Sequence, residues 1–258
     1  MVFCRRKTRG VKEMKILAIE SSGMVASVAV LTDDVLQAEY TVNFRKTHSQ
    51  TLLPMLDTMG AMVELQMDSV DAIAVSGGPG SFTGLRIGAA TAKGLGLAVN
   101  KPLIAVPTVD SIAYNLYDTD GIICPMMDAR RQQVYTGLYH FEDHRMITVM
   151  EQVPMGVDEL IGILNDMNEQ VTFLGDGVPV YKEKILGQMR APYSFAPAHL
   201  NRQRAGAVAA LGMQYFAEGK TVSAEEFRPD YLRVSQAERE RMQKLKENPA
   251  SKQNSAGI

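Results

Sequence analysis

Apolar and polar positions along the chain predict a block of α/β structure between residues 15 and 117. Short apolar runs of strand length alternate with longer segments of helix length. The predicted order is three strands (15–20, 25–31 and 34–41), a helix (48–65), a strand (71–76), a helix (82–99), a strand (102–106) and a helix (108–117). Three strands followed by alternating helices and strands are typical of a mixed sheet with helices packed on it.

The same order of elements begins again at Gly121. The second block is predicted to hold strands at 122–127, 133–139 and 146–151, a helix at 157–168 and a strand at 171–174, and a last helix follows at 205–218. Element order alone therefore predicts an α/β chain made of tandem duplicated βββαβα lobes. Two such lobes facing each other define the architecture of actin, sugar kinases and heat-shock ATPases, in which nucleotide binds between the lobes.

This organisation divides the chain into five parts. The basic leader lacks the apolar stretch of a secretory signal, and we expect it to be disordered, with the folded chain starting at Met14. The charged and polar C-terminal tail is expected to be flexible. The parts are the leader (1–13), a first lobe (14–118), a second lobe (119–204), a C-terminal helix and segment that packs back on the body (205–235) and the tail (236–258).

The composition narrows the function classes. The chain has 258 residues, of which 46% are hydrophobic and 22% charged, as in an ordinary globular protein. Its net charge of -2 provides no overall field that attracts nucleic acid, so any RNA contact has to be local or supplied by a partner. Two cysteines form neither a disulfide framework nor a metal pattern, which favours the cytosol, and no apolar run reaches the roughly 20 residues of a membrane helix.

A glycine-rich stretch at 76–88, Ser-Gly-Gly-Pro-Gly-Ser-Phe-Thr-Gly-Leu-Arg-Ile-Gly, connects a predicted strand to a predicted helix. The geometry is that of a phosphate cradle, but the spacing fits neither G-x-x-x-x-G-K-[ST] nor G-x-G-x-x-G. Along the helix, Gly84, Gly88, Ala92 and Gly96 form a ridge of small residues four positions apart. Each interior glycine costs about 1 kcal/mol relative to alanine, so we expect a close contact on this ridge, from the same chain or from a partner.

Candidate chemistry elsewhere in the chain is sparse. The nucleophile elbow G-x-S-x-G is missing from the sequence. His140 and His144 are four residues apart but lie between two predicted strands, where a solvated loop is favoured over a metal site. His48 stands at a predicted helix start, where a structural role is favoured over catalysis. These patterns alone identify no catalytic residue, no metal ligand and no cofactor.

A vestigial nucleotide site is the remaining candidate. Glu20 and Ser21 end the first predicted strand, where this architecture usually presents polar groups to phosphate or metal. Gly175 and Gly177 flank an aspartate after another strand and could approach a nucleotide, although a simple turn is favoured there.

Four segments together resemble the TsaB family, also called YeaZ. They are Ile16-Leu-Ala-Ile-Glu-Ser-Ser22, Lys46-Thr-His-Ser-Gln-Thr-Leu-Leu-Pro54, the glycine-rich stretch and Pro229-Asp-Tyr-Leu-Arg233, and the resemblance runs from Met14 to about Glu240. It implies a dimerisation subunit of the bacterial complex that places threonylcarbamoyladenosine next to the anticodon of tRNAs reading codons that begin with adenine.

The resemblance also implies the partners of this chain. In the family, the chemistry belongs to a paralogue, TsaD, which is assisted by an ATPase, TsaE. We expect a heterodimer with TsaD, a homodimer when the chain is alone, contact with tRNA only through the complex, no membrane association and a cytoplasmic location. The expected interface lies on the first two long helices and comprises Gly84, Gly88, Ala92, Gly96, Leu52, Met55, Met59 and Met62.

One substitution against the catalytic paralogue predicts a non-catalytic chain. TsaD follows its equivalent of residues 102–106 with Asn-His-x-Glu-Gly-His, whose histidines hold a metal. The present chain reads Pro107-Thr-Val-Asp-Ser-Ile112, so Thr108 and Ile112 stand at the histidine positions, and neither can replace an imidazole. Two alternatives stay open: a nucleotide-dependent kinase or ATPase of the same fold, which would use Glu20 and 175–177, and a metallopeptidase.

Overall fold

The first lobe is built on a five-stranded mixed sheet. A computed structural model describes residues 13–231, so the expectations for the leader, apart from Glu13, and for the tail lie outside the described residues. Strand β1 pairs with β2 in antiparallel fashion and with β4 in parallel fashion, at the centre of the order β3-β2-β1-β4-β5. The strands are β1 (Lys15–Glu20), β2 (Ala26–Thr32), β3 (Val35–Val42), β4 (Ala72–Gly78) and β5 (Leu103–Pro107).

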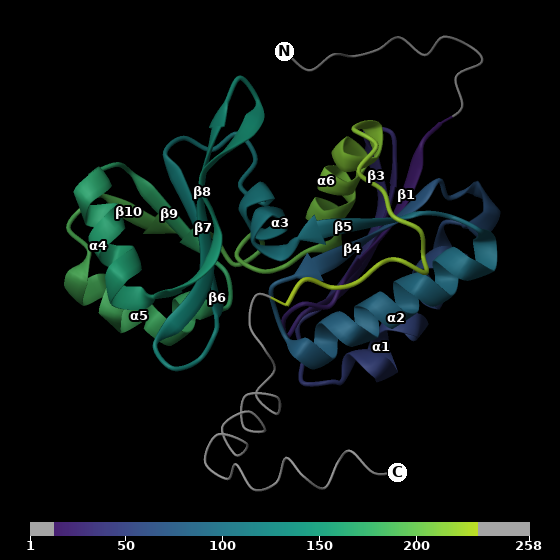
Figure 1. Ribbon diagram of the computed structural model, residues 1–258, viewed down its shortest axis with the longest axis horizontal. Coiled ribbons are helices and arrows are strands. Elements are labelled where there is room, and N and C mark those ends of the chain that lie inside the picture. Colours follow the sequence, from purple (N-terminus) through teal and green to yellow (C-terminus); the bar gives the residue numbers. More distant parts are fainter. Residues whose placement is uncertain (1–12, 232–258) are drawn as a thin grey trace, which may run out of the picture.

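The second lobe repeats this sheet. Its strand order, β10-β9-β6-β7-β8, is the same as that of the first lobe, with β6 in the place of β1. The two lobes lie side by side (Figure 1), which confirms the predicted α/β duplication. The elements are β6 (Ile122–Asp128), β7 (Gln133–Glu142), β8 (Arg145–Gly156), α4 (Val157–Met167), β9 (Val171–Leu174), α5 (Gly177–Gln188) and β10 (Tyr193–Phe195).

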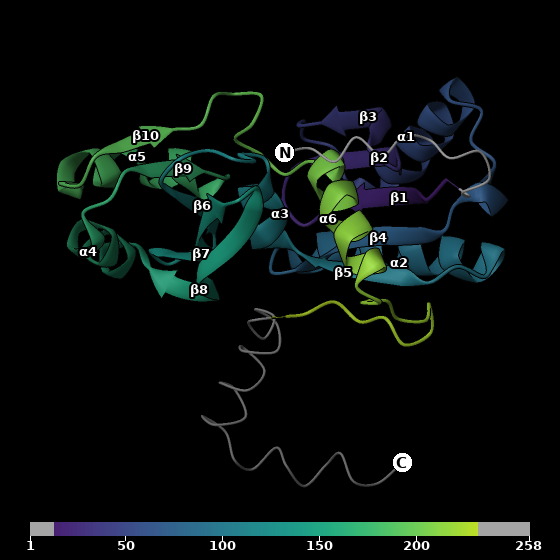
Figure 2. The ribbon, with the colours of Figure 1, turned by 90° about the horizontal axis from the view of Figure 1, so that it is seen from above.

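Helices cover both faces of the first sheet. On one face, α1 (His48–Met62) and α2 (Phe82–Val99) pack side by side against strand residues such as Leu17 and Ile73. On the other face lie α3 (Thr108–Tyr114) and α6 (Ala205–Ala217), which crosses the strands in Figure 2. Strands β1, β2 and β4 are buried on both faces because each face has its own apolar layer, whereas the edge strand β3 is largely exposed. Within the described residues, no helix combines the length and apolar character needed to cross a bilayer.

Several observed elements differ from the predicted ones. Helix α1 ends at Met62 instead of residue 65, because Glu64 adopts a left-handed backbone conformation, and a short 3-10 turn (Met67–Ser69) follows. Strand β8 is longer than predicted. Helix α5 and strand β10 were not predicted at all.

After α6, residues 219–231 return along the first lobe, and we call this segment the strap. Val222 and Leu103 exchange backbone hydrogen bonds of 2.9 Å, and Ala224 and Phe227 are buried in the core beneath α1 and α2. The Lys93 ammonium on α2 donates to the carbonyl of Glu225 at 3.1 Å. Figure 1 shows the strap running beside α2. The core of the first lobe is thus completed by a segment that follows the second lobe in the sequence.

Candidate partner interface and interlobe cleft

The small-residue ridge of α2 faces the interior of the first lobe. A Cβ built on Gly84 would overlap the carbonyl oxygen of Ser21, and one on Gly88 would overlap the Ser21 hydroxyl. A Cβ on Gly96 would lie 3.0 Å from the Leu103 side chain, and Ala92 is fully buried. The expectation that these four residues meet a partner is therefore wrong, because the β1–β2 turn and β5 already occupy the ridge.

Three of the four α1 candidates are also interior. Leu52, Met55 and Met59 lie one turn apart on the buried face of α1 and belong to the core shared with α2 and the sheet. Their expected place in a partner interface is corrected for the same reason: their neighbours belong to their own lobe. Met62, by contrast, is 80% exposed.

The opposite sides of these helices form an exposed apolar surface, which we call the helical face. On α2, Ala90 and Gly94 are exposed, and a Cβ on Gly94 would meet no atom within 4 Å. Small residues there allow another helix to approach closely. Leu97 of α2 and Leu53 of α1 are 53% and 57% exposed. The helical face comprises Leu53, Ala61, Ala90, Gly94 and Leu97.

A hollow of about 540 Å³ adjoins the helical face. Leu53 and Ala61 belong to both, and Leu95 of α2 closes one side of the hollow. Its wall is apolar apart from a few polar groups, of which Asp57 and Glu64 are acidic. A neighbouring protein could therefore insert an apolar side chain next to two carboxylates.

Glu20 and Ser21 are used inside the first lobe. The Glu20 carboxylate is fully buried and accepts hydrogen bonds from the Ser22 amide at 2.6 Å and from the hydroxyl of Ser76. Burial raises the pKa of Glu20, although hydrogen bonds from these serines oppose the rise. The Ser21 hydroxyl donates to the Gly84 carbonyl at 2.9 Å. Both groups therefore fix the β1–β2 turn against β4 and α2.

The two glycines of the second lobe serve close packing against β6. Gly175 has φ of +104°, and a Cβ there would overlap the Met126 carbonyl. A Cβ on Gly177 would come within 2.9 Å of the same oxygen. Gly175 lies in a turn, as the sequence analysis favoured, whereas Gly177 begins helix α5. The Gly175 amide donates a hydrogen bond of 3.0 Å to the Asn201 carbonyl, so this amide already has a partner within the chain.

Between the lobes, the β1–β2 turn meets the second lobe. A Cβ on Gly23 would lie 3.4 Å from the Asp176 carboxylate and still closer to the Gln203 amide, so a larger residue there would require the Gln203 side chain to move. On the other side, the Nε2 atom of His48 lies 2.8 Å from the Gly23 carbonyl, which gives this histidine a structural contact. Burial raises the pKa of Asp176. The β1–β2 turn is thus in contact with the second lobe on one side and with α1 on the other.

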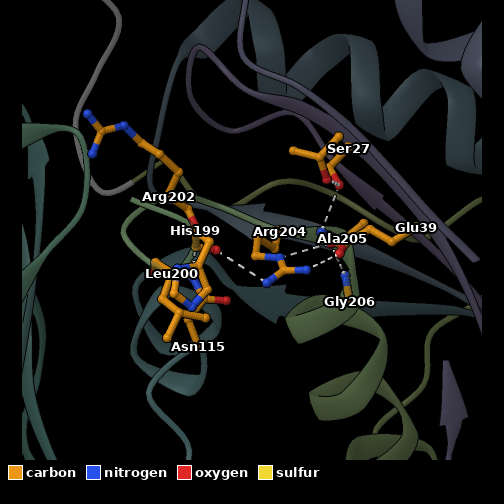
Figure 3. A network of polar contacts seen from close by, with 10 residues as sticks. Ser27, Glu39, Asn115, His199, Leu200, Arg202, Arg204, Ala205 and Gly206 are labelled. Atoms are coloured by element: carbon orange, nitrogen blue, oxygen red, sulfur yellow. Dashed lines mark hydrogen bonds and ion pairs between the residues drawn. The ribbon is translucent and has the colours of Figure 1, made fainter. Parts of the chain in front are cut away.

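A polar network holds the beginning of α6 to the first sheet (Figure 3). The Arg204 guanidinium forms an ion pair with Glu39 on β3 and donates to the His199 carbonyl at 3.3 Å. Glu39 also accepts from the Gly206 amide at 3.0 Å, which satisfies one of the free amides at the helix N-terminus. The chain that returns from the second lobe is therefore fixed where it joins the first.

The residues that the sequence analysis considered as metal ligands, or aligned with metal ligands of the paralogue, have other surroundings. The Nδ1 atom of His144, at the tip of the β7–β8 hairpin, lies 2.7 Å from the Asp118 carboxylate. Thr108 and Ile112 on α3 are fully buried. Among residues 13–231, no group of three or more histidine, cysteine, aspartate and glutamate side chains is arranged to hold a metal ion.

Sequence reasoning missed the junction of two segments that it had singled out separately. The Asp230 amide donates to the Gly77 carbonyl at 2.7 Å, so the end of the strap lies on the glycine-rich stretch. Gly78 has φ of +112° and leaves room for the Asp230 carbonyl. The glycines at 77 and 78 could have indicated a close backbone contact, but nothing in their spacing names the distant segment that makes it.

The chain is similar to proteins of tRNA modification. Residues 41–241 match the family model described as TsaD: tRNA N6-adenosine threonylcarbamoyltransferase. The tRNA threonylcarbamoyladenosine biosynthesis protein TsaB of Bacillus subtilis (strain 168) is 32% identical over 87% of this chain and 96% of its own length. The protein of the same name from Escherichia coli (strain K12) is also 32% identical, over 85% and 95% of the two chains.

Solved structures agree on the fold. An uncharacterized protein from Pseudomonas aeruginosa, described as similar to peptidase YeaZ, superposes with a TM-score of 0.71 and 25% identity over 85% of this chain and 100% of its own. YeaZ from Pseudomonas aeruginosa gives a TM-score of 0.68 at 24% identity, over 84% and 99% of the two chains.

Proposed function

The chain belongs to the TsaB (YeaZ) family of tRNA threonylcarbamoyladenosine biosynthesis proteins, and from this membership we propose that it is a non-catalytic scaffold subunit of that pathway. It heterodimerises with the catalytic subunit TsaD and is required for threonylcarbamoyl transfer to the adenosine next to the tRNA anticodon. TsaE assists the complex, tRNA is reached only through the complex, and the chain forms a homodimer when it is alone. The complex works in the cytoplasm.

The helical face is the observation that carries this proposal. Leu53 and Leu97 are more than half exposed on two adjacent helices, and small residues lie beside them. An exposed apolar surface of this kind is typical of protein interaction sites. The interface that we propose therefore uses the outer sides of α1 and α2, whereas the inner sides form the core.

Three residues support a role without catalysis. Thr108 and Ile112 provide no imidazole at the positions where the catalytic paralogue holds its metal. Glu20, which a kinase-like mechanism would need at the phosphates, is buried in hydrogen bonds with Ser22 and Ser76. The Glu20 carboxylate is fully buried, so it presents no surface on which a ligand could bind.

Reconstitution of tRNA modification from purified components tests the proposal. TsaD, TsaE, the threonylcarbamoyl adenylate and tRNA are combined with and without this chain, and modified adenosine is measured. We expect modification to depend on the chain, while the chain alone neither modifies tRNA nor hydrolyses ATP. Full modification in its absence would contradict the scaffold role. ATP hydrolysis by the chain alone that is lost in Glu20→Ala would support an enzyme instead.

A further inference from the structure

Three features meet at the N-terminal end of α2. The strap reaches the glycine-rich stretch through the hydrogen bond between Asp230 and Gly77. The next residue, Tyr231, places its ring 4.9 Å from the ring of Phe82, the first residue of α2. Tyr231 remains 38% exposed. The strap therefore ends by adding an exposed aromatic ring to the outer surface of α2.

Arg86 completes this arrangement, and we call Phe82, Arg86 and Tyr231 the Arg86 stack. The guanidinium carbon of Arg86 lies 3.9 Å from the centre of the Phe82 ring. Arg86 is exposed, and no ion pair or hydrogen bond of its side chain is found within residues 13–231. The ring orients the planar guanidinium, and its N–H groups have no partner among the residues that the structure describes. Such a group is suited to bind a carboxylate through two parallel hydrogen bonds.

The Arg86 stack continues the helical face. Arg86, Ala90 and Gly94 follow each other at intervals of four residues, so they lie on one side of α2. Arginine and tyrosine are enriched among the residues that dominate binding energy in protein interfaces. Because the stack already restrains the Arg86 side chain, less conformational entropy is lost when a partner binds.

We propose that the Arg86 stack is the charged end of the partner interface. The partner subunit presents a carboxylate that pairs with Arg86 and an apolar side chain that packs on the rings of Phe82 and Tyr231. This inference rests on the proposed function, since it assigns a chemistry to the surface that meets TsaD. A protein partner is favoured over RNA because the stack adjoins the apolar helical face and the whole chain has a net charge of -2.

Titration of the cognate TsaD into the full-length chain, followed by calorimetry, tests this assignment. Arg86→Ala should weaken the affinity about tenfold or more, as expected for a residue that dominates an interface. Arg86→Lys should not restore it, because lysine keeps the charge but lacks the planar fork. Tyr231→Ala should weaken binding as well, and the double variant should lose less than the sum of the two, since both act through one contact.

Arg190→Ala is the matched control, because Arg190 is an exposed arginine of the second lobe. It should bind TsaD as the wild-type chain does, and all variants should melt at similar temperatures. If the wild-type chain does not bind TsaD, the proposed function fails. If the wild-type chain binds and Arg86→Ala or Arg86→Lys binds equally well, only the present inference is overturned. It is also overturned if Arg86→Ala leaves the TsaD affinity unchanged and reduces tRNA binding by the complex.

Discussion

Gly88 and Gly94 lie on the same helix but have different surroundings, so alanine should affect them in opposite ways. A Cβ at Gly88 would overlap the Ser21 hydroxyl, whereas one at Gly94 would point into open space. We expect Gly88→Ala to lower the free energy of unfolding by about 1–3 kcal/mol, as overpacking does. Gly94→Ala should raise it by up to about 1 kcal/mol through helix propensity. Urea unfolding of both variants measures the difference, and equal effects would contradict the packing described for α2.

Glu20 should make the stability of the protein depend on pH in an unusual direction. Burial raises its pKa above the ordinary value of 4.5, so the folded chain keeps the proton at pH values where the unfolded chain has lost it. The unfolded state then binds fewer protons, and the free energy of unfolding falls as the pH rises above 4.5 until the pKa of the folded state is passed.

The variant Glu20→Gln removes this titration. The free energy of unfolding of the wild-type chain, relative to that of Glu20→Gln, should therefore decrease as the pH rises above 4.5. Urea unfolding of both chains at a series of pH values measures the difference. A difference that stays constant over this range would show that Glu20 does not titrate as its burial requires.

At the scale of the helix, the outer side of α2 should tolerate charge in the free protein but not in the complex. Leu97 is 53% exposed, so Leu97→Glu should leave the fold intact. In the proposed complex it would bury an unpaired carboxylate and weaken the affinity for TsaD about tenfold or more. Val180→Glu, at a residue that is 57% exposed on α5 in the second lobe, is the control. Titration with TsaD measures both, and equal binding would exclude this side of α2 from the interface.

The spacing of apolar and small residues predicted where α2 lies, but not which segments pack against it. The helix was predicted at 82–99 and is observed at Phe82–Val99. The spacing of the small residues also showed that one side of the helix needs close contact. Whether a partner or the same lobe provides that contact depends on the β1–β2 turn, and no local pattern reports where this turn lies. The ridge was therefore assigned to a partner, although the turn and strands of its own lobe occupy it.

Helix α5 was missed because its sequence resembles a loop. It begins at Gly177, has proline at its third position and contains another glycine at 187. Glycine and proline usually mark turns. Only Val178, Tyr181 and Ile185 carry the helical spacing of apolar residues, and they pack into the core of the second lobe. Tertiary packing thus stabilises a helix that local propensity does not predict.

At the scale of the whole molecule, element order predicted the duplication, whereas the contacts that join the two ends of the chain were not predictable. Glu39 and Arg204 form an ion pair across a sequence separation of 165 residues. Each is one charged residue among many, so no motif connects them. The segment that begins at Pro229 and the glycine-rich stretch were both recognised as segments of a family, yet only the fold shows that they touch.

Helix α6 sets the order in which the lobes can be completed during synthesis on the ribosome. It packs on β1, β2, β4 and β5, but it is translated only after the entire second lobe. Until then, one face of the first sheet, including Ile16, Ala29 and Ile104, has no helix over much of its apolar surface. The main core of the second lobe, which includes Leu160 and Phe173, consists of residues between 122 and 195. The lobe that is translated first therefore matures last, and its uncovered face is what a chaperone would meet on the nascent polypeptide.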